Sequence, residues 1–232
     1  NPGKLGVHAY PPWHTTYFWF YGWLHQQACS TLMLCLYAFG CIAFFLYLRK
    51  WQPQTLPEKI FYYAFIALAI SEPVAGCFVS GNYGILLMCA TILLYEGLKR
   101  KHTLLTALAW AFIMMKPQVG LLFFWPLVFS KRYKAITFAI AICLLATLWP
   151  AYVYHCSPVE LILQIPKCGE PYLRFNANRG TYYGLASLFL GPKGIPLWMG
   201  GCFIACGIFS YLLRRAPSWS VRLLPVILFF PI

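Results

Sequence analysis

Long apolar stretches separated by short clusters of basic residues are the feature that most constrains how this chain folds. Apolar residues make up 61% of the 232 residues and charged residues only 10%, whereas an ordinary soluble domain has about a quarter charged residues. A water-soluble fold cannot hide that much apolar surface. The sequence therefore predicts an integral membrane protein with roughly eight hydrophobic segments.

The segments are apolar runs bounded by charged or turn residues. They are Ala28–Leu48, Ile60–Ser80, Tyr83–Leu98, Leu104–Met115, Val119–Phe129, Ala135–Tyr154, Ile195–Leu213 and Leu223–Ile232.

Every second connection between these runs is basic. The basic residues of the four connections are Arg49, Lys50 and Lys59; Lys99, Arg100 and Lys101; Lys131, Arg132 and Lys134; and Arg214, Arg215 and Arg222. The positive-inside rule places these connections in the cytoplasm and the Gly81–Asn82 turn, the Lys116 turn and the loop from His155 to Gly194 on the far side. A bilayer thus accounts for the formal charge of +13, and we expect no binding to nucleic acid.

Two of the runs, Leu104–Met115 and Val119–Phe129, are short. Each gives at most about 18 Å of helix, too little to cross a bilayer comfortably. If they formed one span kinked at Lys116 and Pro117, the next basic cluster would face outward and break the charge rule. We therefore favour two short helices that meet at a turn below the outer surface.

A lysine and non-helical backbone at membrane depth are tolerated only where they line a wet cavity or are buried in protein. The predicted fold class is accordingly all-α: a polytopic transmembrane helical bundle with short or re-entrant helices around an outward-facing cavity.

Internal repeats and linkers are not visible, so residues 1–232 are expected to form a single membrane domain. The missing initiating Met and the short last run lead us to expect a fragment truncated at both ends.

Acidic residues are scarce, because the chain has no Asp and only five Glu. Glu58 and Glu96 have structural interpretations, the latter as an i,i+4 ion pair with Arg100. Glu72 lies within an apolar run, directly before Pro73. An intramembrane acid is expensive, and two explanations stay open: a protonated carboxyl bonded to a neighbouring helix, or a role in the cavity.

The predicted outer face combines cations with amides and phenols. Guanidinium and ammonium groups suit phosphoryl oxygens, whereas amides and phenols suit sugar hydroxyls. The candidate substrate-binding residues are Lys116, Arg179, Asn82, Asn178, Arg174 and Tyr10.

The sequence shows no motif for a metal site or a nucleotide cofactor. The five His residues do not cluster at metal-ligand spacing, and no Walker loop or Gly-rich dinucleotide turn is present, so we expect neither metal nor cofactor. Cys156 and Cys168 share the outer loop and could pair in an oxidising compartment.

Four motifs, in this order, resemble those of a known enzyme family. They are Tyr10-Pro11-Pro12 before the first span; Ser80-Gly81-Asn82 leading to Leu86-Leu87, with departures at Tyr83 and Gly84; the basic loop Lys99–Lys101, Lys116-Pro117 and Lys131-Arg132-Tyr133-Lys134-Ala135; and Asn176-Ala177-Asn178-Arg179-Gly180 followed by Gly184-Leu185.

Together these segments resemble glycosyltransferase family 87, the polyprenyl-phosphate-mannose-dependent mannosyltransferases of the C-type superfamily. The resemblance implies transfer of a hexose, typically mannose, from a polyprenyl-phosphate donor to a lipid or glycan acceptor on the non-cytoplasmic face. It implies a multi-pass protein of the bacterial inner (plasma) membrane, in contact with membrane lipids. Lys116 and Arg179 would hold the donor phosphate, and Asn82 and Asn178 the sugar or head group.

The family's catalytic base is expected in an outer loop before residue 1, so the fragment alone should be inactive, with Glu72 only a weak substitute. Two other readings are a lipid-linked glycan ligase or polymerase, which needs a much larger outer loop, and a transporter, which needs repeats and paired broken helices.

Overall fold

The computed structural model describes residues 12, 26–69, 84–163 and 194–229. Within these residues every regular element is helical and no strand is present, so the predicted all-α class is confirmed for this part of the chain. The elements are α2 (Gln26–Lys50), α3 (Leu56–Ala69), α5 (Gly84–Lys99), α6 (Thr103–Ile113), α7 (Pro117–Gly120), the 3₁₀ turn η3 (Leu121–Phe123), α8 (Phe124–Phe129), α9 (Tyr133–Val153), α12 (Gly194–Leu212) and α13 (Trp219–Leu228).

Most predicted runs coincide with helices to within a few residues, but two expectations need correction. The run Val119–Phe129 is not one regular helix, because the 3₁₀ turn η3 interrupts it between α7 and α8. The stretch from His155 is not purely a loop, since residues 158–163 are helical. Cys156 has no disulfide partner among the described residues, and Cys168, with which it was suggested to pair, lies outside them.

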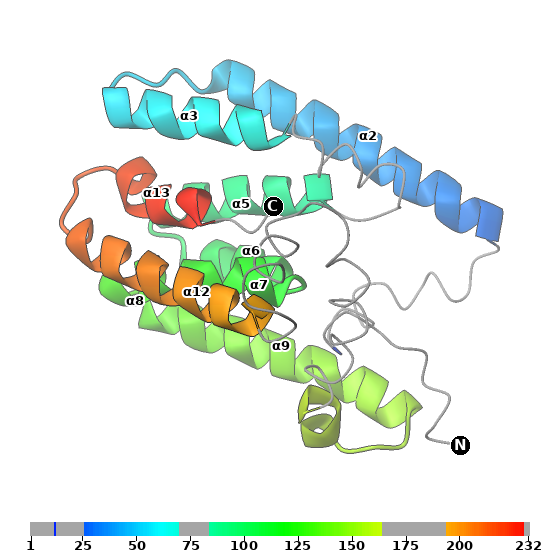
Figure 1. The fold of residues 1–232 in the computed structure, drawn as a ribbon. Coiled ribbons are helices and arrows are strands. Elements are labelled where there is room, and N and C mark those ends of the chain that lie inside the picture. Colours follow the sequence, from blue (N-terminus) through cyan, green and yellow to red (C-terminus); the bar gives the residue numbers. More distant parts are fainter. Residues whose placement is uncertain (1–11, 13–25, 70–83, 164–193, 230–232) are drawn as a thin grey trace.

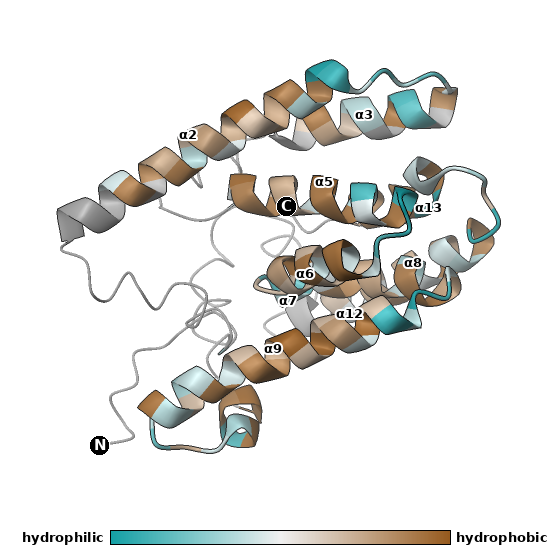
Figure 2. Ribbon diagram, turned by 180° about the vertical axis from the view of Figure 1, so that it is seen from behind, coloured by the Kyte–Doolittle hydropathy of each residue, from teal (hydrophilic) through white to brown (hydrophobic). Residues whose placement is uncertain are grey.

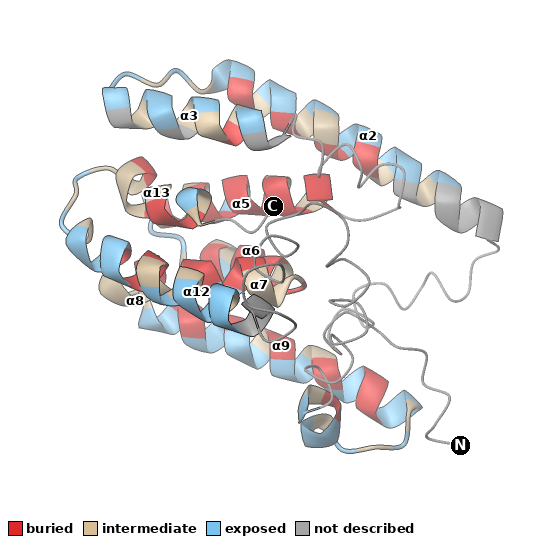
Figure 3. Ribbon diagram, viewed as in Figure 1, coloured by how far each residue is buried: buried red, intermediate tan, exposed pale blue. Residues whose placement is uncertain are grey.

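The centre of the structure is the hairpin of α5 and α6, which Figure 3 shows as mostly buried. Leu94, Ala107 and Ile113 have no exposed surface. The two helices lie close together at Gly97, where a Cβ atom would lie 2.7 Å from Thr106 Oγ1 and 2.9 Å from the Thr106 backbone nitrogen. Only glycine fits this contact, because any side chain would meet backbone that cannot move aside.

Helix α9 packs on α6 through a stripe of small residues spaced by four, and Cys143 Sγ approaches the Ala111 carbonyl oxygen at 3.9 Å. The buried residues of the stripe are Ala135, Ala139, Cys143, Thr147 and Ala151. Large apolar side chains cover the opposite face: Phe138 is 50% exposed and Leu145 65%. This arrangement, with small residues at the helix–helix contact and large apolar residues on the outer face, is typical of helices that face lipid rather than water.

Helix α2 also exposes large apolar side chains such as Phe39 and Phe45, but its buried face carries the large residues Tyr37, Phe44 and Leu48. Figure 2 shows that both helices consist largely of hydrophobic residues. Among the described residues, α9 is the one helix that meets the combined length and hydropathy criteria for crossing a membrane. Shorter apolar helices cover Thr103–Ile113, Pro117–Phe129, Leu197–Leu212 and Trp219–Leu228.

All four basic connections lie at the same end of the helical assembly, on the left in Figure 1 and on the right in Figure 2. Contacts join them there: Tyr47 donates to Glu96 Oε1 at 2.6 Å, and Arg132 Nη2 donates to the Leu98 carbonyl at 3.4 Å. Glu96 also pairs with Arg100 at 2.8 Å, as predicted from their spacing. We call this surface the basic end; the turn between α6 and α7 lies toward the opposite end (Figure 1).

The contact at Gly97 leads to a stability prediction. Gly97→Ala should lower the free energy of unfolding by about 1–3 kcal/mol, because the new methyl group overpacks the α5–α6 contact. Gly201, on α12, is the matched control, since no heavy atom lies within 4 Å of its added Cβ; Gly201→Ala should stabilise its helix by up to about 1 kcal/mol. Thermal unfolding of both variants in detergent measures the difference, and equal midpoints would contradict this packing.

Candidate functional site

The break between α6 and α7 at Lys116 is the most distinctive local feature of the described chain. Pro117 is the first residue of α7 and cannot donate a backbone hydrogen bond, so α6 cannot continue through it. The residue before a proline avoids the helical region, and Lys116 accordingly has φ −111° and ψ 90°. Its carbonyl oxygen accepts from the Val119 and Gly120 nitrogens, both at 2.9 Å, which starts the new helix.

Tight packing holds the break in one geometry. The indole nitrogen of Trp110 donates to the Gly120 carbonyl at 2.8 Å inside the core. A Cβ atom on Gly120 would lie 2.6 Å from Met114 Sδ and 2.8 Å from Met114 Cα, so glycine is required where α7 folds against the end of α6. The neighbouring Met115 is fully buried. Lys116 is therefore presented from a rigid turn, with its own side chain only half-buried.

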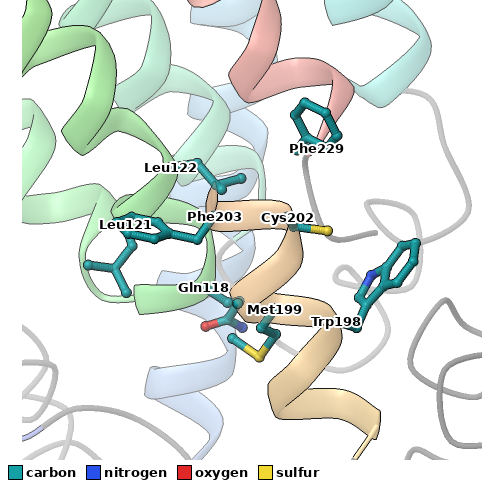
Figure 4. A pocket seen from close by; sticks show the side chains of 9 residues that line it. Gln118, Leu121, Leu122, Trp198, Met199, Cys202, Phe203 and Phe229 are labelled. Atoms are coloured by element: carbon teal, nitrogen blue, oxygen red, sulfur yellow. The ribbon is translucent and has the colours of Figure 1, made fainter. Parts of the chain in front are cut away.

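A cavity of about 230 Å³ lies next to this turn, between the α7–η3 segment and α12 (Figure 4). Its lining is mostly apolar. The polar side-chain groups are the amide of Gln118, two residues after Lys116, the indole N–H of Trp198 and the thiol of Cys202. The lining residues are Gln118, Leu121, Leu122, Trp198, Met199, Gly200, Cys202, Phe203 and Phe229.

Helix α12 is held against α8 on one side of this cavity. The Trp125 indole nitrogen donates to the Phe203 carbonyl at 2.9 Å, and the two rings lie 5.1 Å apart. Gly207 makes room for Trp125, because a Cβ there would be 2.9 Å from the indole. The wall that carries Phe203 and Cys202 is thus positioned by backbone contacts as well as by apolar packing.

The turn and the cavity together suit one kind of molecule. The Lys116 ammonium group can bind an anion and the Gln118 amide can bind hydroxyl or phosphoryl oxygens, whereas the cavity, which Lys116 itself does not line, is mostly apolar. An amphiphile with an anionic head and an apolar chain would match a cationic turn that lies next to a mostly apolar cavity.

Most of the predicted site lies elsewhere in the chain. Tyr10, Glu72, Asn82, Arg174, Asn178 and Arg179 are outside the described residues. Lys116 is the predicted substrate-binding residue that falls within them. Sequence reasoning missed Gln118 and the α12 residues of the cavity; a glutamine inside an apolar run was the available signal for the first.

No curated protein and no solved structure matches this chain. The model of glycosyltransferase family 87 matches residues 8–231, nearly the whole chain. The resemblance drawn from the sequence motifs is thereby confirmed: this chain belongs to glycosyltransferase family 87.

Proposed function

We propose that this protein is a multi-pass membrane hexosyltransferase that transfers mannose from a polyprenyl-phosphate donor to a lipid or glycan acceptor on the non-cytoplasmic face. Membership of family 87 makes it a glycosyltransferase. The observation that carries the choice of donor is the half-buried Lys116 at a rigid helix break beside an apolar cavity. A polyprenyl phosphate is an amphiphile with an anionic head and an apolar chain.

The exposed apolar faces of α2 and α9 support the membrane location, because large apolar side chains such as Phe39 and Leu145 are disfavoured in contact with water. In the proposed orientation the basic end is cytoplasmic. The turn between α6 and α7 then faces the opposite side, where the donor and acceptor meet.

The proposed reaction inverts the sugar in one displacement. An acceptor hydroxyl attacks the anomeric carbon, a carboxylate takes the hydroxyl proton, and the bond to the phosphate oxygen breaks with its electrons staying on the polyprenyl phosphate. Lys116 and Arg179 neutralise the charge that develops on that phosphate. In this proposal Asn82 and Asn178 contact the sugar, Arg174 and Tyr10 also bind substrate, and Glu72 is the candidate carboxylate within this chain.

A lysine at membrane depth costs about 3 kcal/mol on insertion scales. A phosphate next to Lys116 would offset part of this cost, in addition to the contacts that Lys116 makes within the protein. The described residues hold no observation that favours a ligase, a polymerase or a transporter instead.

The role of Lys116 leads to the first functional prediction. In the full-length protein, Lys116→Met should reduce kcat/KM for sugar transfer by about 10²–10³-fold, since the departing phosphate loses a charge partner. Lys134→Met is the matched control, because Lys134 is exposed at the basic end and should leave transfer unchanged. Normal transfer by purified, folded Lys116→Met protein would exclude the phosphate role.

The cavity leads to a second prediction, which uses adjacent glycines of α12. Gly200 lines the cavity and Gly201 does not, and a Cβ atom on either meets no neighbour within 4 Å. Gly200→Leu should raise KM for the polyprenyl donor by about tenfold, because it fills space meant for the apolar chain. Gly201→Leu should leave KM unchanged; steady-state kinetics with equal effects of both variants would contradict this use of the cavity.

Orientation is tested by labelling. In intact cells a membrane-impermeant maleimide should modify Ser157→Cys but reach Arg100→Cys only after permeabilisation, because the basic end faces the cytoplasm. Mass spectrometry of the labelled peptides separates these sites from the native cysteines. Modification of Arg100→Cys from outside would overturn the topology.

A further inference from the structure

At the basic end, two arginines from different segments share one indole ring. The guanidinium carbon of Arg132, in the α8–α9 connection, lies 5.7 Å from the centre of the Trp219 ring, and that of Arg222, on α13, lies 5.0 Å from it. All three side chains are half-buried. Contact with an aromatic face holds a guanidinium in a defined plane, so this pair differs from freely moving surface cations.

The hydrogen-bonding capacity of Arg132 is not used up by the fold. One terminal nitrogen makes the long bond of 3.4 Å to the Leu98 carbonyl, while Nε is buried and has no acceptor among the described residues. Arg222 differs, because its Nε donates to the Ala216 carbonyl at 2.7 Å and so has a structural partner. A buried donor without an acceptor is unfavourable, so the described residues leave the hydrogen-bonding capacity of the Arg132 guanidinium incompletely used.

In the described part of the chain neither arginine takes part in an ion pair. The two acids at this end have other partners: Glu96 is engaged by Arg100 and Tyr47, and Glu58 accepts from the backbone nitrogens of Gln54 and Thr55. Arg132 is also the residue that precedes α9, and no side chain caps that helix N-terminus. The partial positive charge of an uncapped helix start adds to that of the guanidinium.

We propose that Arg132, with Arg222 and the N-terminus of α9, binds a phosphate group at the basic end. A guanidinium offers the planar fork of donors that fits phosphate oxygens. This site lies at the end of the helical assembly away from the turn of Lys116, and it does not depend on the proposed transfer reaction. The exposed ring of Tyr133 and the exposed side chain of Leu212 flank the connections, so the phosphate of an anionic lipid headgroup can be reached from the apolar surface.

The test measures lipid retained by the purified full-length protein. Native mass spectrometry after incubation with dioleoylphosphatidylglycerol should show retained lipid, and Arg132→Gln should reduce its affinity about fivefold. Lys134→Gln is the matched control, because it removes the same charge from an exposed position in the same connection. Equal losses for the two variants, or none for either, would show only diffuse attraction and overturn the site.

A competition experiment distinguishes binding of a lipid headgroup from binding of free inorganic phosphate. If inorganic phosphate displaces the lipid from wild-type protein at millimolar concentration, and Arg132→Gln abolishes its binding, the site takes free phosphate; if only the lipid binds, it takes the headgroup. Both results support a phosphate site at Arg132.

A second measurement needs no variant and therefore does not depend on the folding of Arg132→Gln. Phosphatidylglycerol should protect Arg132 of the wild-type protein from an arginine-specific glyoxal reagent, read peptide by peptide by mass spectrometry. The exposed Arg215 at the same end should remain reactive. Absence of selective protection of Arg132 would overturn the proposal.

Discussion

The close packing of α6 between α5 and α9 through small side chains is the constraint on which the rest of the structure depends. Gly97 against Thr106 and the stripe with Ala139 and Cys143 bring backbones near one another. Such packing uses van der Waals contact and leaves the bulky apolar side chains for the outer surface. The distribution of small and bulky residues thus determines both the close packing of the core and the apolar outer surface.

The rigid core fixes the position of the helix break at Lys116. A lysine on a mobile loop would be one more solvated cation, whereas here Gly120 and Trp110 hold the turn against α6. The cavity beside it owes its shape to α12, a distant segment held by Trp125. The proposed donor would therefore contact elements that are far apart in the sequence. The two ends of the assembly also differ in chemistry: the turn of Lys116 and the mostly apolar cavity lie toward one end, and the basic connections lie at the other.

Much of the fold was predictable because helical segments in an apolar chain are local properties. The run Ala135–Tyr154 became α9 (Tyr133–Val153) with bounds shifted by one or two residues, and Pro117 marked the helix break in advance. The prediction of one continuous helix over Val119–Phe129 was wrong, because the 3₁₀ turn η3 interrupts it. Hydropathy is nearly uniform there, so it carries no signal for a change of helical type. Of the candidate site, the sequence identified Lys116 but not the cavity wall.

The sequence by itself determined the all-helical class, the helix break before Pro117, the alternation of basic connections and the family. Each depends on residue type and short-range spacing, which are readable along the chain. Only the tertiary structure decided that Arg132 and Arg222 meet at Trp219, that α12 faces Gln118 across a cavity, and which glycines are required by contact. These facts arise from packing between distant segments, because side-chain volume and backbone approach, rather than hydropathy, select the partners of each helix.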